Sequence, residues 1–256
     1  MATTTTPTAH DGPTANTDTG STSSAERLVG ARIRRKEDPR FITGRGQYTD
    51  DVKVQGTLHV AFVRSPHAHA RIRGVDLAAA RTQPGVVAVY TGKDLADGGV
   101  NGIPVGWLLP GLTPSNHHAI AVEKVHYVGE AVAIIVAESP YAARDAAELV
   151  TVDYDPLPAV ADAEQALTQD VPIVRNAGTD NVCFRWQIGD AAATDAAFAQ
   201  ATTVVRQRLV NQRLIPVAIE PRASLATYVR ATDELTLWVT SQNPHVHRLI
   251  MGAFVL

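Results

Sequence analysis

The sequence is poor in cysteine, with Cys183 as the only one among its 256 residues. One thiol cannot form a disulfide within the chain, and it cannot supply a cysteine-rich zinc or iron–sulfur site. We therefore expect a reducing compartment and a cytoplasmic location. Cys183 stands among apolar and aromatic neighbours in "NVCFRW", which predicts a buried, unreactive thiol.

Excess positive charge and long apolar runs are also missing. Lys and Arg number 23 against 26 for Asp and Glu, which disfavours a nucleic-acid-binding surface. No run approaches the length of a membrane-spanning helix. Residues 1–26 are rich in Thr, Ser, Ala and Gly and lack both the apolar segment of a secretory signal and the arginines of a mitochondrial presequence. We expect a disordered tail there, and an apolar content of 45% supports a folded core beyond it.

The sequence of the first half of the chain contains patterns typical of strands and helices. "GTLHVAFVRS" alternates with period two and predicts a half-buried strand, and "PGVVAVYTGKDL" predicts a second strand after a Pro-Gly turn. "VGEAVAIIVA" is almost continuously apolar, as in a strand buried on both faces. Ser139 and Pro140 then predict a helix through "YAARDAAELV", and "VTVDYDPLPAV" predicts another strand. This order predicts an α/β domain that contains a βαβ unit with a right-handed crossover.

A Gly- and Pro-rich segment, residues 97–118, separates these patterns. It predicts a long irregular loop with a functional or partner-facing role.

The second half begins near Ala161 and contains fewer helices. Asp190 predicts the cap of an Ala-rich helix, "DAAATDAAFAQA", and "TTVVRQRLVNQR" predicts a strand. "RASLATYVRATDELTLWVTS" predicts two strands joined by a turn around Thr232 and Asp233. Asn243 and Pro244 predict the cap and first turn of a last helix. That helix is apolar and has no C-terminal capping residue, so we expect the front part of a longer protein, with a second domain begun and not completed.

Nine histidines invite a metal site, but their spacing does not favour one. His67 and His69 leave a strand in "SPHAHAR", and His245 and His247 lie two apart on the predicted last helix, where they diverge. No Asp or Glu stands near them at ligand spacing. We expect capping or polar packing roles instead and nominate no metal ligand. We nominate no catalytic residue either, because the chain has no nucleophile motif, and "GGVNGIPVG" lacks the Lys-Ser/Thr of a phosphate-binding loop.

Gln242 follows the strand "LTLWVTS" and precedes the last helix. Free N–H groups at a helix N-terminus favour anionic or oxo ligands, and a glutamine amide both donates and accepts. From the residues alone, a plain helix-capping role is the stronger interpretation, and a ligand contact is the alternative.

Six stretches, in order, resemble one known family. They are "FITGRGQYTDD", "RSPHAHARI", "YVGEAVAIIVA" (Ala131 stands where Pro is frequent), "VDYDPLPAV", "NQRLIPVAIEPRA" and "LTLWVTSQNPHVHR". From about Arg34 to the last residue the chain resembles the large, molybdenum-binding subunit of the xanthine dehydrogenase, aldehyde oxidase and aerobic carbon monoxide dehydrogenase superfamily. The resemblance implies an α/β (α+β) fold: an a/b hammerhead domain at 27–160, then the start of a truncated molybdopterin-binding domain at 161–256.

The resemblance also implies chemistry and partners. It implies a molybdopterin cofactor in its cytosine dinucleotide form and the oxidation of an aldehyde, an N-heterocycle or carbon monoxide, with water as the oxygen source. Electrons would leave through an iron–sulfur small subunit and an FAD-binding medium subunit, in a homodimer of heterotrimers. Gln242 matches a glutamine that lies beside the molybdenum centre and hydrogen-bonds an oxo ligand. Glu220, in "IEPRA", matches a position to which we assign a structural role.

Three features of the family have no counterpart before Leu256: the Gly-rich cofactor cradle, the loop that distinguishes carbon monoxide oxidation, and the catalytic glutamate. We therefore expect this polypeptide to be inactive alone. The alternative is a non-catalytic hammerhead module that docks partner subunits of a split or relic enzyme, with residues 97–118 as a candidate contact.

Overall fold

The computed structural model describes residues 32–100, 102–105, 108–114, 117–168, 170–174 and 180–255. The expected tail at 1–26 lies outside the described residues. The chain divides into two units, the first ending at Gln47 and the second beginning at Tyr48. The first contains the short helix α1 (Asp38–Ile42), where the Asp38 carboxylate accepts a hydrogen bond from Arg35 Nε at 2.9 Å. No residue of α1 is buried.

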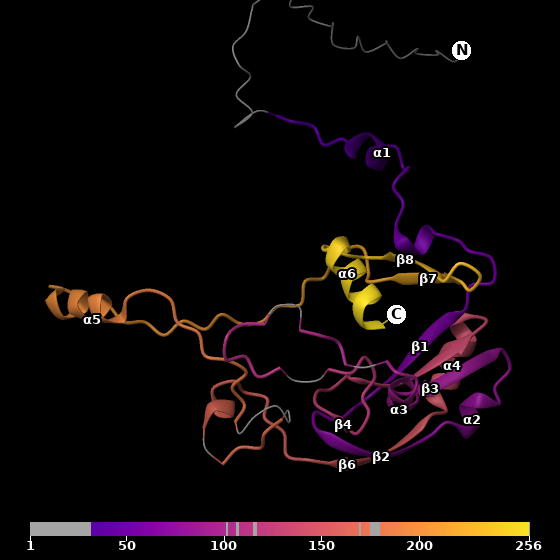
Figure 1. Cartoon of the computed structure of the whole chain (residues 1–256), viewed down its shortest axis with the longest axis horizontal. Helices are drawn as coiled ribbons and strands as arrows, with labels where there is room; N and C mark the ends of the chain where they lie inside the picture. The colour runs from indigo at the N-terminus through magenta and orange to yellow at the C-terminus, as the bar shows by residue number, and fades with distance from the viewer. Residues whose placement is uncertain are drawn as a thin grey trace, which may run out of the picture. The chain divides into compact units, whose positions relative to one another are not determined.

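Two antiparallel three-stranded sheets form the first part of the second unit (Figure 1). In the first sheet the central strand is β5 (Ala131–Ala137), flanked by β1 (His59–Arg64) and β3 (Val86–Thr91). In the second the central strand is β2 (Ala70–Asp76), flanked by β4 (Lys124–Val125) and β6 (Thr151–Pro156). β5 is buried along almost its whole length, which confirms the prediction of a strand covered on both faces.

The predicted βαβ unit is wrong, although its three elements exist. Helix α4 (Pro140–Glu148) follows β5, and Ser139 Oγ accepts the Ala142 N–H at 3.1 Å, which confirms the predicted cap. However, β5 and β6 belong to different sheets and both pair antiparallel with their neighbours. α4 therefore connects two sheets and is not a crossover within one. The partner of a strand is a non-local property, which the local pattern did not contain.

Two clusters of buried side chains form the core between these elements. One joins the first sheet to α4 and to α2 (Ala78–Arg81), and its buried members are Leu77, Ala80, Val89, Ala133, Ile135 and Ala146. The other joins β5 to the second sheet, with Ala70, Ala121, Val125 and Val132. Many of these side chains are alanines, which lets the elements approach closely.

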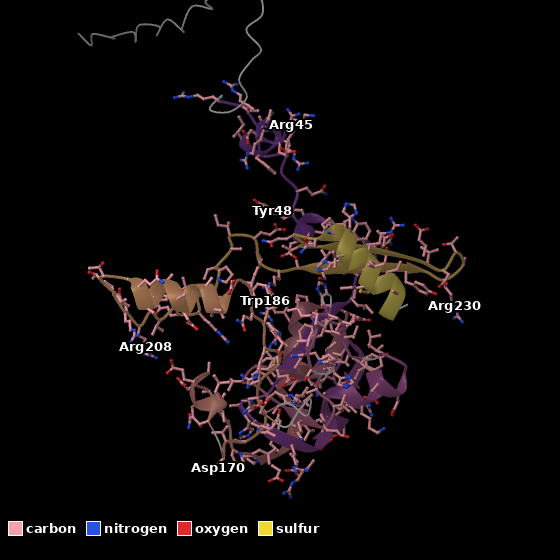
Figure 2. All side chains as sticks on the ribbon, turned by 60° about the vertical axis from the view of Figure 1, so that its left-hand side comes forward. Arg45, Tyr48, Asp170, Trp186, Arg208 and Arg230 are labelled. Carbon is pink, nitrogen blue, oxygen red and sulfur yellow. The ribbon has the colours of Figure 1, made fainter. Side chains whose placement is uncertain are left out.

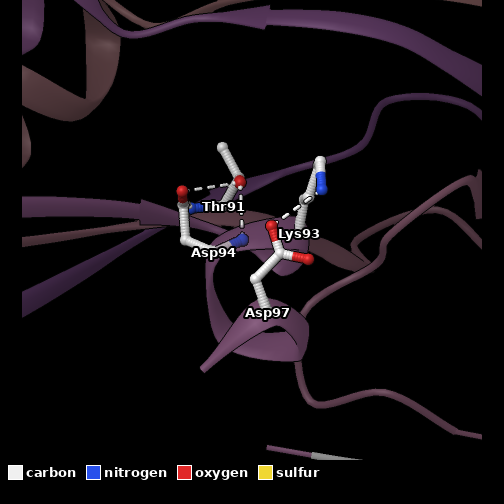
Figure 3. A network of polar contacts seen from close by, with 4 residues as sticks. All are labelled: Thr91, Lys93, Asp94 and Asp97. Carbon is white, nitrogen blue, oxygen red and sulfur yellow. Dashed lines mark hydrogen bonds and ion pairs between the residues drawn. The ribbon is translucent and has the colours of Figure 1, made fainter. Parts of the chain in front are cut away.

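Helix α3 (Gly92–Asp97) follows β3 and begins with a capping box (Figure 3). Asp94 Oδ2 accepts the Thr91 N–H and the Thr91 hydroxyl, each at 2.7 Å, and the Asp94 N–H donates to Thr91 Oγ1 at 3.3 Å. The backbone donor is the main cause of a lowered pKa of Asp94, and the hydroxyl adds to it. Lys93 Nζ pairs with Asp97 Oδ2 at 2.7 Å on the exposed surface.

The loop expected at 97–118 starts at the end of α3. In its described residues the structure has turns and one isolated bridge between Ile103 and His117. The irregular conformation is thus confirmed for those residues.

The second half contains separate elements joined by long coil. They are the short 3-10 helix η2 (Gln165–Leu167), α5 (Ala191–Gln200), β7 (Ser224–Val229), β8 (Glu234–Val239) and α6 (Pro244–Ile250), which continues as the π-helical segment η3 (Met251–Val255). Asp190 Oδ1 accepts the Ala193 N–H at 2.9 Å, so the predicted cap of α5 is confirmed. β7 and β8 form the predicted antiparallel hairpin. Its turn places Asp233 at φ 54°, where Tyr228 Oη donates to Asp233 Oδ1 at 2.7 Å.

One prediction for the second half is wrong. Residues 203–213, inside the predicted strand "TTVVRQRLVNQR", are exposed coil. Asn243 precedes α6 as expected, but its side chain makes no capping hydrogen bond. The segment 203–213 has no partner strand in the described part of the chain, and an unpaired strand gains no hydrogen bonds from the extended conformation. Within the same described part, no helix is both long and apolar enough to cross a bilayer.

Candidate cofactor-contact site

Gln242 lies at the strand-to-helix junction that the sequence predicts, between Val239 at the end of β8 and Pro244 at the start of α6. Its side chain is exposed, and no hydrogen bond to it is present among the described residues. Its amide is therefore available as both donor and acceptor.

The backbone on either side of Gln242 is held in place. The Thr240 N–H donates to the Ala223 carbonyl at 3.1 Å, and the Ala223 N–H donates to Thr240 Oγ1 at 3.3 Å, which extends the hairpin by one residue pair. The Asn243 N–H donates to Ser241 Oγ at 3.0 Å. The junction thus fixes the backbone and leaves the glutamine amide to make contacts outside it.

A cavity of about 480 Å³ lies next to the junction, between β8 and α6. Its strand wall is largely apolar, and its helix wall carries the side chains of His247 and Arg248. α6 is only seven residues long and lacks a side-chain cap. The case for a ligand here therefore depends on the Gln242 amide and not on the helix dipole.

Histidines at the start of β2 take the polar packing roles that the sequence predicts. His69 is buried, and its Nδ1 lies 2.7 Å from the Pro158 carbonyl. Because a carbonyl only accepts, that nitrogen carries the proton. The ring of His67 meets the ring of Tyr154 edge-on, with centroids 4.9 Å apart. Throughout the described ranges, no three His, Cys, Asp or Glu residues are arranged to hold a metal ion.

Glu130 is a buried carboxylate that sequence reasoning missed. It accepts the backbone N–H of His126, whose ring stacks on that of His69 with centroids 6.2 Å apart. The Glu130 carbonyl also accepts the Ser65 N–H at 2.9 Å. These contacts tie the chain after β4 to the turn between β1 and β2. A charged residue inside an otherwise apolar run, "YVGEAVAIIVA", was the available signal.

Cys183 contradicts the prediction of a buried thiol, because it is exposed. It lies in coil at 182–188, where the aromatic neighbours are also exposed: Phe184 by 45% and Trp186 (labelled in Figure 2) by 67%. Apolar neighbours predict burial only where the segment packs against something. Glu220 is half-buried, and its structural role stays a prediction.

Comparisons with known proteins match both halves of the chain. Residues 43–158 match the family "Aldehyde oxidase and xanthine dehydrogenase, a/b hammerhead domain". Residues 174–255 match the "Molybdopterin cofactor-binding domain" family.

Relatives and solved structures agree with these matches. The carbon monoxide dehydrogenase large chain of Afipia carboxidovorans is 40% identical over 242 residues, which cover 89% of this chain and 29% of that one. The nicotine 6-hydroxylase large subunit of Paenarthrobacter nicotinovorans is 38% identical, with 89% and 28% covered. Among solved structures, a Cu,Mo-CO dehydrogenase aligns with a TM-score of 0.78 at 39% identity, covering 88% of this chain and 29% of that one. Quinoline 2-oxidoreductase from Pseudomonas putida 86 aligns with a TM-score of 0.80 at 37% identity, covering 87% and 28%. The chain spans under a third of the length of these relatives.

The fold and the two matches define an a/b hammerhead domain followed by molybdopterin cofactor-binding domain sequence. The relatives named as a carbon monoxide dehydrogenase and a nicotine 6-hydroxylase each align with 89% of this chain, and so with both matched ranges. Together these matches support a fragment of a molybdenum hydroxylase large subunit.

The chemistry of the junction fits a molybdopterin-type group. Such a group presents polar oxygen and nitrogen atoms, and the free Gln242 amide can hydrogen-bond either kind without bringing a charge to the site. The hydrogen bonds of Thr240 and Ser241 keep the adjacent backbone donors occupied. Among these junction residues, Gln242 and Asn243 have exposed side chains that make no hydrogen bond to the described residues.

Proposed function

We propose that this chain provides the hammerhead domain, residues 27–160, and the opening of the molybdopterin-binding domain, residues 161–256, of a molybdenum hydroxylase large subunit. That enzyme would oxidise an aldehyde, an N-heterocycle or carbon monoxide with water as the oxygen source. The observation that carries the proposal is the order of the two domain matches, at 38–40% identity to relatives named for carbon monoxide and nicotine oxidation.

Gln242 is the residue of this chain that we assign to the cofactor. We expect the molybdopterin to be the cytosine dinucleotide form, and the bound cofactor would supply the two-electron redox chemistry. The Gln242 amide would hydrogen-bond a polar atom of that group and orient it. Thr240 and Ser241 would act through the backbone, because their hydroxyls accept from Ala223 and Asn243 and so hold the junction in place.

We also propose partner subunits and a location. Names such as "large chain", "large subunit" and "complex subunit gamma" describe the relatives as parts of larger assemblies. By analogy, an iron–sulfur small subunit and an FAD-binding medium subunit would receive the electrons, in a homodimer of heterotrimers in the cytoplasm.

These 256 residues are not expected to turn over substrate by themselves. The test compares the purified chain with the same chain co-purified from cells that also express iron–sulfur and flavin subunits. Molybdenum and pterin would be quantified, and dye reduction would be measured with carbon monoxide, an aldehyde and an N-heterocycle. We expect little molybdenum and no dye reduction in the chain alone. Stoichiometric molybdenum with dye-linked oxidation in the chain alone would contradict the expected inactivity, whereas an assembled complex without molybdenum would overturn the proposed function.

The second candidate is a non-catalytic hammerhead module that docks partner subunits. It is favoured by exposed apolar side chains in the segment 97–118, the candidate contact, where Ile103 and Leu108 are 54% and 69% exposed. Such side chains are typical of surfaces that another protein covers. Co-purification of the chain with the other subunits, without molybdenum, would support this candidate over the enzyme.

A further inference from the structure

β1 lies at the edge of its sheet, because the strand order is β1-β5-β3. It spans six residues, His59–Arg64, and pairs with β5 on one side. In the described part of the chain, no strand pairs with its other side. Such an edge exposes backbone N–H and C=O groups that can pair with another extended chain.

A groove of about 330 Å³ runs along this edge, between β1 and α4. Successive residues of a strand point to opposite faces of the sheet. Consecutive β1 residues, which point to opposite faces of the sheet, both line the groove. The groove therefore follows the edge of the strand and does not lie on one face of the sheet. Its lining residues are His59, Val60, Ala61, Phe62 and Arg64 of β1 with Pro140 and Arg144 of α4.

The groove combines positive charge with apolar surface. Arg64 is held in place, since its guanidinium lies over the Phe62 ring at 5.3 Å and its Nη1 donates to the Gly129 carbonyl at 2.8 Å. Arg144 is exposed. Within the described residues, neither arginine forms an ion pair with a carboxylate. Val60 and Phe62 are 52% and 49% exposed.

We propose that β1 binds an extended acidic segment of a partner protein, which adds to the sheet as a strand in the groove between β1 and α4. The unpaired backbone edge selects an extended segment. Arg144 selects carboxylates on the α4 side, since its charge lacks an acidic partner. Val60 and Phe62, which share the opposite face of β1 with Arg64, accept the apolar side chains that alternate with those carboxylates. A helical segment fails the first condition, because its backbone groups are already paired, and a basic segment fails the second, because it lacks carboxylates. This inference does not depend on the molybdenum cofactor.

The test uses the full 256-residue chain and a fluorescent, end-capped eight-residue peptide in which Glu and Val alternate. We expect saturable binding by fluorescence anisotropy, and binding about tenfold weaker or worse when every Glu is replaced by Lys. Arg144→Gln should weaken binding about three- to tenfold, because it removes one unpaired charge and keeps a good helix former. Arg230→Gln is the matched control and should leave binding unchanged, because Arg230 lies on the distant-in-sequence hairpin turn (Figure 2) and is exposed.

Backbone pairing is tested with two further peptides, N-methylated at either the odd or the even residues. A strand directs alternate N–H groups to opposite edges, so one of these peptides should lose binding and the other should keep it. Equal binding of the Glu and Lys peptides, no effect of Arg144→Gln, equal behaviour of the two N-methylated peptides, or no saturable binding would each overturn the proposal. Circular dichroism of each variant checks that the fold is kept. Because no cofactor enters this assay, its failure is distinct from a failure of the proposed function.

Discussion

Gly92→Ala is expected to destabilise the hammerhead domain strongly. Gly92 is buried at the start of α3, and a Cβ on it would lie 2.2 Å from the Ala121 carbonyl oxygen and 2.6 Å from that of Ile120. Both obstacles are backbone atoms, so no side chain can rotate away. Ala121 also donates its N–H to the Ala131 carbonyl of β5 at 2.8 Å. Moving this segment by the required distance therefore disturbs the pairing of the central strand.

Overpacking of this kind costs about 1–3 kcal/mol, and the higher helix propensity of Ala returns at most about 1 kcal/mol. Because backbone must move, we expect the upper part of that range, about 2–3 kcal/mol, or a melting temperature lower by about 5–10 °C. Gly74→Ala is the control, since Gly74 has nothing within 4 Å of the added Cβ and no positive φ. Urea unfolding of both variants measures the difference. If Gly92→Ala is within about 0.5 kcal/mol of Gly74→Ala, the steric argument is refuted.

Three further predictions follow from single sites. Asp94→Ala should lower the free energy of unfolding by about 1 kcal/mol at pH 7, because it removes the capping box with Thr91. Since the folded state lowers the pKa of Asp94, the difference from the unchanged protein should shrink as the pH falls below about 4. A difference that stays constant with pH in urea titrations would contradict this explanation. Ile135→Ala should lower the free energy of unfolding by about 2–5 kcal/mol, because the Ile135 side chain is fully buried between the first sheet and its helices. A decrease of less than about 1 kcal/mol in the same titrations would mean that the core is packed differently. Gln242→Ala in the assembled complex should lower dye-linked activity or molybdenum content at unchanged melting temperature, since its amide makes no hydrogen bond within the described structure; unchanged activity and molybdenum content would remove it from the site.

Elements whose ends are fixed by neighbouring residues could be predicted from the sequence. The side-chain oxygens of Ser139 and Asp190 each accept the backbone N–H of the residue three positions later, so each helix cap depends only on nearby residues. The turn at Asp233 is similar, because a left-handed residue between two alternating segments specifies a hairpin. The burial of β5 was likewise present in its continuous apolar run.

The errors all concern what a segment packs against. β6 joins β2 and not β5, and no local feature of Thr151–Pro156 distinguishes the two sheets. The apolar residues at 203–213 predicted a strand, but a strand also needs a partner, and none pairs with this segment in the described structure. The prediction that Cys183 is buried is wrong for the same reason, since its neighbours Phe184 and Trp186 are exposed in the described structure. The proposed cofactor contact of Gln242 came from the motif resemblance, because its position alone favoured a helix-capping role.

The distribution of burial decides how each half of the chain can be studied. Every residue that the structure describes as buried lies between Ser65 and Ala146, and none of the described residues after Ala146 is buried. The free energy of unfolding of the isolated chain should therefore come almost entirely from the hammerhead domain, because apolar burial is the main favourable term. The β7–β8 hairpin and α6 contribute little to it, since none of their residues is buried and a two-stranded hairpin is marginal in water. It follows that substitutions in the hammerhead are properly tested by unfolding the chain alone, whereas the role proposed for Gln242 is tested by molybdenum content and activity in the assembled complex.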